Sequence, residues 1–270
     1  MRILIRTSKW AIWARRLGSF AMPLAIIPVF LHRERIISSD DFLLIELIAA
    51  GFALLAAFLG VGAYVRLWVT GDQGWSRATV GLFFSAVCLA PIAFVFWMAL
   101  RYPATYDVST NPANPPALVT IVARVMTPGQ RAAAESAFPN ARTRTYPIGA
   151  EQMFGIVEQM EAQKGWELRA RRAPTNPLDE GTLNAIATTL LGWRDEVVVR
   201  VAGTAAGSVV DMRSAATHGW SDLGENGRRI EEFLLELDTR ITLMLRDAPQ
   251  TPTAPADDTA TPQVQDEEAE

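Results

Sequence analysis

Residues 78–100 form a run of 23 residues without a charged side chain, and this run constrains the fold more than any other stretch. A helix needs about 20 apolar residues to cross the hydrocarbon core of a bilayer. Residues 42–65 make a second apolar block of 24 residues, whose single acid, Glu46, lies close to its start. Both blocks therefore predict membrane-spanning helices.

A shorter apolar block, residues 17–31, has 15 residues and contains Pro23 and Pro28. Trp10 and Trp13 precede it, and tryptophan favours the membrane–water interface, so the block can extend into a first spanning helix. The alternatives are a cleavable signal peptide and a segment that only dips into the bilayer. Two long spans follow and no Ala-x-Ala site occurs near residue 30, which favours three spans.

The distribution of basic residues predicts the orientation of these spans, because cytoplasmic segments carry an excess of Lys and Arg. The basic segments are the one before the first block and the loop between the second and third blocks, with Arg2, Arg6, Lys9, Arg15, Arg16, Arg66 and Arg77. With three spans, everything after Arg101 faces outward. This predicts a multi-pass protein of the inner (cell) membrane with a periplasmic or otherwise extracytoplasmic domain. If the first block only dips into the bilayer, the domain is cytoplasmic.

Charge and residue usage exclude several classes of function. Residues 1–100 carry nine Lys+Arg against five Asp+Glu, residues 101–247 carry 16 against 18, and residues 248–270 carry six acids and no base. No part has the basic stripe that nucleic-acid backbones require, so nucleic acid is not an expected partner. The chain has two histidines and one cysteine, Cys88, without paired ligand spacing, so neither a metal site nor a cofactor is predicted.

Composition also divides the chain into four regions. Residues 1–100 are the membrane region with the three spans given above. Residues 101–116 are a proline-rich linker, because four prolines force extended geometry on the residues that precede them. Residues 117–247 form a soluble domain, and residues 248–270 are an acidic tail that is disordered by composition.

Hydrophobic periodicity predicts three helices and four strands in the soluble domain. The expected helices are residues 127–138, 149–164 and 222–246, and the expected strands are residues 166–172, 182–191, 197–202 and 209–215. Consecutive strands without crossover helices pair antiparallel in sequence order. The predicted fold is therefore α+β: three N-terminal transmembrane helices, followed by an antiparallel four-stranded meander with helices packed on one face.

The densest group of polar side chains lies where the second predicted strand ends, the third begins and the fourth leads into the last helix. In a meander these points share one edge. The residues expected to converge there as a binding site are Asp195, Arg213, Ser214, Ser221, Asp222, Asn226 and Arg229, with His218 among them. The alternative is turn-and-cap structure, in which Asp222 caps the last helix and Arg200 pairs with Asp211 across two strands.

These residues favour a binding or interaction module over an enzyme. A Ser–His–Asp arrangement can be written with His218, but a nucleophilic serine needs its base within about 3 Å and an oxyanion donor pair. No Gly-x-Ser-x-Gly elbow occurs, so no catalytic residue is assigned. A hydrolase-type enzyme with its site at this edge and a structural subunit of a membrane assembly are the alternatives.

Large apolar residues flank the same edge, at Leu190, Leu191, Trp193 and Trp220. They either cap the core or form an exposed rim that meets a partner or the lipid surface. The expected partners are the lipid bilayer, into which the chain is integrated, and an envelope protein or a small ligand.

Three segments carry a resemblance to a known family: DVSTNPANPP, GWRDEVVVRV and VDMRSAATHGWSDLGENGRRI. Together they resemble the bacterial domain-of-unknown-function 1499 family over about residues 102–238. The matching residues are Asp107, Ser109, Thr110, Pro112, Pro115, Pro116, Asp195, Arg200, Arg213, Ser214, Gly219, Ser221, Asp222, Gly224, Asn226, Arg229 and Ile230. The chain departs at Ala216, Thr217 and Trp220, where the family pattern has Ser, Arg and Arg. The resemblance implies an envelope location and no established activity.

Overall fold

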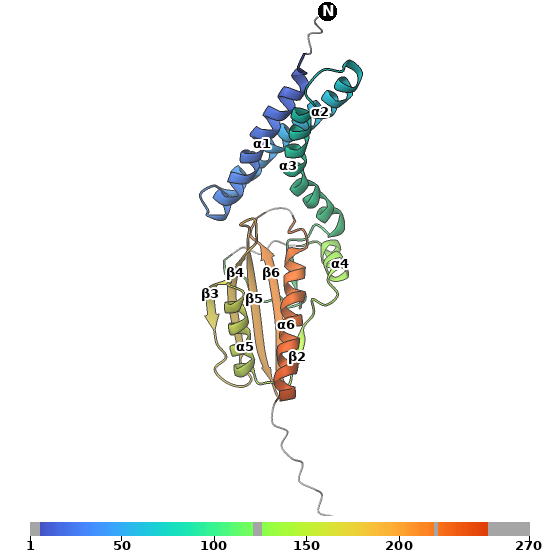
Figure 1. The fold of residues 1–270 in the computed structure, drawn as a ribbon. Coiled ribbons are helices and arrows are strands. Elements are labelled where there is room, and N and C mark those ends of the chain that lie inside the picture. Colours follow the sequence, from blue (N-terminus) through green and yellow to red (C-terminus); the bar gives the residue numbers. More distant parts are fainter. Residues whose placement is uncertain (1–5, 121–125, 219–220, 248–270) are drawn as a thin grey trace, which may run out of the picture.

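Three apolar helices make up the N-terminal part of the computed structural model, which describes residues 6–120, 126–218 and 221–247 (Figure 1). They are α1 (Lys9–Arg33), α2 (Ser39–Thr70) and α3 (Trp75–Arg101), and each is long and apolar enough to cross a membrane. The prediction of three apolar helices is confirmed. The helix α1 has 25 residues, although the block that predicted it has only 15. The predicted acidic tail lies outside the described residues.

The three helices pack through small residues. A Cβ added to Gly18 would lie 2.8 Å from the carbonyl oxygen of Gly81, and one added to Gly81 would lie 2.5 Å from the carbonyl carbon of Ala14. Small residues let helix backbones approach closely, and this contact holds helices together in lipid. The small buried residues of the bundle are Ala11, Ala14, Gly18, Ala21, Ala49, Ala53, Ala56, Gly60, Ala63, Ala78, Gly81, Ser85 and Cys88. Large apolar side chains such as Phe58 and Phe96 are exposed on the outside of the bundle.

One antiparallel sheet with the strand order β1-β6-β5-β4-β3 forms the centre of the part of the chain that follows α3, and β2 also pairs with β6. The strands are β1 (Asp107–Ser109), β2 (Arg144–Tyr146), β3 (Glu167–Arg172), β4 (Glu180–Thr188), β5 (Arg194–Thr204) and β6 (Gly207–Ala216). The α+β class and the meander from β3 to β6 are confirmed, but the sheet has six strands, not four. The two extra strands, β1 and β2, have three residues each, too few to show the alternation that reveals a strand in a sequence. The strand β1 lies within the segment that composition predicts to be a linker.

Two helices cover one face of this sheet (Figure 1). The helix α5 (Ala150–Gln163) packs mainly on β4 and β5, and α6 (Glu225–Asp247) packs on β6 and β1. The core between helices and sheet includes Met153, Val157, Leu183, Val197, Val199, Val201, Met212, Phe233 and Leu237. A shorter helix, α4 (Pro128–Ala137), begins with a capping box formed by Thr127 and Gln130. This is the helix start that the sequence predicts.

Irregular chain instead of a helix covers the opposite face of the sheet. Residues 110–120 lie against this face, where the backbone carbonyls of Asn114, Pro116 and Ala117 accept hydrogen bonds from side chains of the sheet. The sheet therefore has two covered faces of different kinds: a helix face, contacted by α5 and α6, and a loop face, contacted by residues 110–120.

The strand β3 forms the outer edge of the sheet, and most of its residues are exposed. The alternation of apolar and charged residues in 166–172 predicts a strand with one buried face. The strand is present, but the predicted burial of Leu168 is wrong, since its side chain is 50% exposed. Trp166, just before the strand, does reach the core and stacks on Phe233 with ring centroids 5.6 Å apart.

Candidate functional site

Arg229 is the centre of the polar group at the edge where β5 begins, β6 ends and α6 starts. Its guanidinium donates to Asp195 Oδ2 over 2.8 Å, to Ser214 Oγ over 2.8 Å and to Asn226 Oδ1 over 2.7 Å. The hydroxyl of Ser214 in turn donates to Asn226 Oδ1 over 2.6 Å. Four of the residues predicted to form a binding site are thus brought together. We call these four residues the Arg229 cluster.

The Arg229 cluster is buried. Asp195 is 3% exposed, and Ser214 and Asn226 are not exposed at all. Burial raises the pKa of Asp195, while the Arg229 guanidinium beside it acts in the opposite direction. A buried charge is tolerated in a protein when it is paired and hydrogen-bonded, as both charges are here. The geometry is therefore that of a connection between α6 and the sheet.

Asp222 and Ser221 organise the start of α6. The carboxylate of Asp222 accepts hydrogen bonds from the backbone N–H groups of Gly224 and Asn226, each over 3.0 Å, so the predicted cap is present. Burial raises the pKa of Asp222, and these two N–H groups partly offset that effect. Ser221 Oγ accepts a hydrogen bond from the N–H of Leu223 over 3.1 Å. Both side chains thus bind backbone groups of their own turn.

Arg213 does not converge with the other predicted residues, because it lies on the loop face of the sheet. Successive residues of a strand point to opposite faces, so Arg213 and Ser214 cannot point to the same side of β6. The guanidinium of Arg213 makes two hydrogen bonds to the carboxylate of Asp107, over 2.9 Å and 2.6 Å. A third bond of 3.0 Å reaches the carbonyl oxygen of Pro116.

Other charged residues of the loop face hold residues 110–120 in the same way. Arg200 donates to Asp211 Oδ2 over 2.6 Å, which confirms the predicted cross-strand pair. Glu196 accepts hydrogen bonds from the backbone N–H groups of Val119 and Thr120, over 2.7 Å and 2.9 Å. Sequence reasoning missed Glu196, because its partners lie in irregular chain whose position has no periodic signal.

The described residues do not have the geometry that a catalytic Ser–His–Asp arrangement with His218 would need. Nδ1 of His218 lies 3.1 Å from Thr217 Oγ1, while the hydroxyl of Ser214 is directed to Asn226. Asp211 bonds Arg200 on the loop face and is therefore on the far side of the sheet. The residues that the structure describes also hold no group of three or more His, Cys, Asp and Glu side chains suited to a metal ion.

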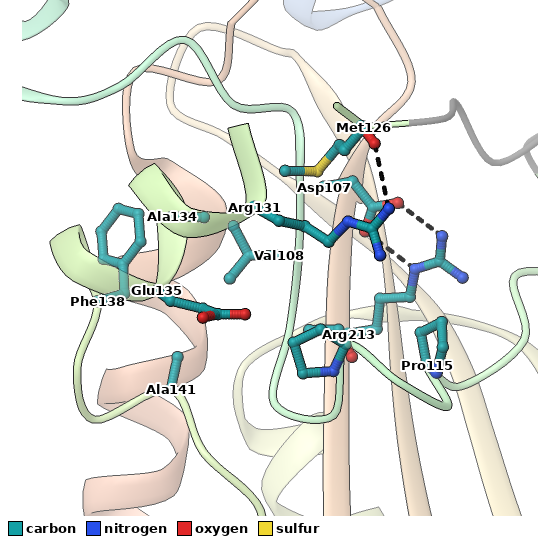
Figure 2. Close-up of a pocket in the computed structure, with 12 residues that line it drawn as sticks. Asp107, Val108, Pro115, Met126, Arg131, Ala134, Glu135, Phe138, Ala141 and Arg213 are labelled. Carbon is teal, nitrogen blue, oxygen red and sulfur yellow. Dashed lines mark hydrogen bonds and ion pairs between the residues drawn. The ribbon is translucent and has the colours of Figure 1, made fainter. Parts of the chain in front are cut away.

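A cavity of about 170 Å³ opens between α4 and β1 (Figure 2). Its apolar wall is formed by Val108, Pro112, Pro115, Met126, Ala134, Phe138 and Ala141. Its polar lining is formed by Asp107, Ser109, Arg131, Glu135 and Arg213. The buried pair of Asp107 and Arg213 lies on one side of the cavity, and residues of α4 lie on the other. We call this space the α4–β1 cavity.

Two charged side chains of opposite sign, Arg131 and Glu135, line the α4–β1 cavity. They lie one helical turn apart on α4, and Figure 2 shows both directed over the cavity. Arg131 makes one long hydrogen bond, 3.4 Å, to the carbonyl oxygen of Met126. Within the described part of the chain, neither Arg131 nor Glu135 belongs to an ion pair. Sequence reasoning missed them because they look like ordinary surface residues of an amphipathic helix.

Comparison with known families identifies the domain that carries these features. Residues 107–237 match the family model described as Protein of unknown function (DUF1499). These residues belong to the DUF1499 family. The match begins with the first residue of β1 and ends within α6, so it includes the whole sheet, α5 and the first part of α6. No curated protein and no solved structure matches the chain.

The residues that carry the DUF1499 resemblance largely contact one another. They supply both members of the pairs Asp107–Arg213, Asp195–Arg229 and Ser214–Asn226, as well as the cap at Asp222. At Thr217, where the family pattern has Arg, the hydroxyl instead donates to the backbone carbonyl of Arg194. In this chain the family pattern therefore corresponds mainly to the buried polar networks that hold the domain together.

Proposed function

We propose that the protein is a membrane-anchored binding module of the cell envelope, whose DUF1499 domain faces outward and takes a small ligand in the α4–β1 cavity. The observation that carries the proposal is the pair Arg131 and Glu135, two charges of opposite sign beside an apolar cavity. The Arg229 cluster is a weaker candidate, because its polar groups are buried and bound to one another.

The size and lining of the α4–β1 cavity define the class of ligand. A volume of about 170 Å³ is smaller than the ~300–1,000 Å³ of sites for drug-sized molecules. The site therefore suits a small molecule or one end of a larger one. Met126, Ala134 and Phe138 offer apolar surface. Arg131 suits a carboxylate or phosphate, and Glu135 suits an amine or hydroxyl. A small amphipathic compound with an acidic group and a donor group fits best.

The outward orientation rests on the positive-inside rule. Seven of the nine basic residues among residues 1–100 belong in the sequence to the end of the bundle that holds the start of α1 and the connection from α2 to α3: Arg2, Arg6, Lys9, Arg15, Arg16, Arg66 and Arg77. Reporter fusions test this directly. A fusion at residue 72 is expected to be active in the cytoplasm, and a fusion after residue 110 is expected to be active outside it. Cytoplasmic activity at both positions would contradict the outward orientation.

Ligand binding is tested by native mass spectrometry on the full chain, purified in mild detergent from membranes of its own organism. We expect a small molecule to stay bound to the wild type. The fraction of Arg131→Ala that retains this molecule should be at least several-fold lower. The matched control is Arg142→Ala, since Arg142 is exposed in the loop after α4 and does not line the cavity. Equal retention in the two variants would contradict this site. A structural subunit without a ligand would show no bound molecule in any of them.

A further inference from the structure

The tip of the hairpin between β4 and β5, residues 189–193, is bound to the C-terminal end of α1. Nδ1 of His32 lies 2.7 Å from the carbonyl oxygen of Leu191 and donates to it. The guanidinium of Arg33 donates to the carbonyl oxygen of Leu190 over 2.9 Å. The soluble domain is therefore attached to the membrane bundle at a second place, besides its covalent connection after α3.

Aromatic rings reinforce this attachment. His32 stacks on Phe42 with ring centroids 4.7 Å apart, and the ring of Trp193 meets His32 edge-on at 4.9 Å. His32 belongs to the last turn of α1 and Phe42 to the first turns of α2. If α1 and α2 cross the membrane, their junction lies at the boundary between lipid and water. The hairpin tip must then lie at the same depth.

The hairpin tip presents leucine at this depth. Leu190 is 82% exposed and Leu191 is 39% exposed. Gly192 makes the turn with a φ of +90°, and a Cβ there would lie 2.8 Å from the Cα of Arg33, so the tip lies directly against the helix end. An exposed leucine side chain is less favourable in water than in an apolar environment. Next to a bilayer the same side chain can enter the acyl-chain region.

Arginine side chains gather beside the tip. Arg35, Arg169 and Arg194 each form an ion pair with Glu167, at 3.4, 2.8 and 2.7 Å. Three guanidinium groups thus share one carboxylate. Their side chains are between 29% and 59% exposed. The group has donors left for an anion.

The acids of the same loop do not cancel this local excess. Asp40 and Asp41 lie in the first turn of α2, where the positive end of the helix dipole offsets their charge. Asp41 also accepts a 2.7 Å hydrogen bond from the hydroxyl of Ser38. None of the ion pairs between described residues joins these acids, or Glu34, to the arginines around Glu167. The phosphate groups of phospholipids lie at this depth and have the complementary charge.

We propose that the β4–β5 hairpin tip is a lipid-binding element of the DUF1499 domain. Leu190 enters the acyl-chain region of the adjoining leaflet, and Arg35, Arg169 and Arg194 bind phosphates of its phospholipids. The partner follows from continuity with the ends of α1 and α2 and from charge complementarity. The element holds the sheet at a defined distance from the membrane, independently of any ligand in the α4–β1 cavity.

The insertion of Leu190 is tested on the full chain reconstituted in phospholipid nanodiscs. Cys88→Ala removes the native thiol, and Leu190→Cys is labelled with an environment-sensitive fluorophore. We expect blue-shifted emission, strongly quenched by lipids with a spin label near the headgroup end of the acyl chain. The matched control is Leu178→Cys, which is 67% exposed and precedes β4, at the opposite end of the strand from Leu190. Its label should show the emission of water and little quenching.

Two results would overturn the insertion. One is a label at position 190 that is as solvated and as weakly quenched as the label at position 178. The other is blue-shifted emission without quenching by the spin-labelled lipid, which would mean that a protein surface covers the tip.

The contact between arginine and phosphate has its own test. Native mass spectrometry counts the phospholipids that stay bound after release from nanodiscs of mixed anionic and zwitterionic lipid. The double variant Arg35→Gln, Arg169→Gln should retain several-fold fewer anionic lipids than the wild type. Arg172→Gln is the control, because Arg172 ends β3 and pairs with Asp179. Equal retention in the double variant and the control would overturn the phosphate contact.

Discussion

The two faces of the central sheet are covered in different ways and use different residues. On the helix face, β5 and β6 present Val197, Val199 and Met212 to α5 and α6. On the loop face, the same two strands present charged residues, among them Arg200 and Arg213, to residues 110–120. Both faces are buried, so burial alone does not decide which residue types a face carries.

The difference follows from the hydrogen bonds of the covering segment. A helix satisfies its backbone N–H and C=O groups internally, so the surface that faces it can be apolar. An irregular segment cannot do this, and each buried backbone group without a partner costs about 1–3 kcal/mol. The sheet therefore provides the partners: Arg213 for Pro116, Arg200 for Asn114, and Glu196 for the N–H groups of two further residues. Charged residues on a buried sheet face thus mark where irregular chain lies.

The largest effect is expected from Arg213→Met on the loop face. It leaves the buried carboxylate of Asp107 without its cation and the carbonyl of Pro116 without its donor. Breaking a buried ion pair in this way costs about 3–5 kcal/mol. Urea unfolding of the full chain in detergent micelles, followed by tryptophan fluorescence, measures the loss. Residues 110–120 should also become sensitive to limited proteolysis. A stability change below about 1 kcal/mol would mean that the loop face does not depend on this pair.

Met212→Ala makes the corresponding change on the helix face, one residue earlier in β6. The side chain is fully buried against the helices, and truncating a buried methionine costs about 2–5 kcal/mol. Here the loss should leave residues 110–120 as protected as in the wild type when both proteins are compared under conditions where they are folded. Equal proteolysis of this segment in Met212→Ala and Arg213→Met would break the distinction between the two faces.

Glu161 of α5 is a buried acid on the otherwise apolar surface that faces the sheet. Its charged form should lower the stability of the folded domain. Glu161 is 4% exposed, and neither carboxylate oxygen has a hydrogen-bond partner among the described residues. Burial, with a smaller effect from Glu158, raises the pKa of Glu161 from 4.5 to about 8. The folded state thus binds this proton more tightly than the unfolded state, so stability falls as the pH rises from about 4.5 to about 8.

Glu161→Gln should therefore stabilise the domain by about 3 kcal/mol at a pH of about 7 and have little effect at a pH of about 4. The measurement is urea unfolding at both pH values. Glu158→Gln is the control: Glu158 lies on the same helix but pairs with Arg171 over 2.5 Å, so its change should not stabilise. A gain at Glu161 that is the same at both pH values would show that its charge is not the cause.

The smallest effect is expected at Asp222, where the helix face does need a polar side chain. The backbone groups of a helix lack hydrogen-bond partners within the helix only at its ends. At the start of α6, the carboxylate of Asp222 accepts hydrogen bonds from two backbone N–H groups. Asp222→Ala should cost about 0.5–2 kcal/mol, and Asp222→Asn, which can still cap, should cost less. Thermal unfolding of the two variants side by side compares them. An equal loss in both would point to the carboxylate charge instead of the cap.

Periodicity predicted the elements that bury one side against the core. The helix α6 and the strands β4 to β6 repeat apolar residues at spacings of a helix or a strand, and their order implied the meander. Register also predicted the Arg200–Asp211 pair. The strands β1 and β2 were missed because three residues carry no readable period. The contact between Asp195 and Arg229 could be predicted, because the order of the strands places both residues at one edge of the sheet. The α4–β1 cavity could not be predicted, because no local sequence pattern indicates it.

The sequence by itself determined the three apolar helices, the antiparallel meander and the cap of α6, because each depends on residues that are close along the chain. Only the tertiary structure decided that residues 110–120 cover the sheet and that Arg213 binds Asp107, a partner 106 positions away. It also decided that the hairpin tip meets the ends of α1 and α2, where His32 reaches Leu191 across 159 positions. Such contacts depend on how distant segments pack in space, and charge or hydrophobicity along the chain does not specify that packing.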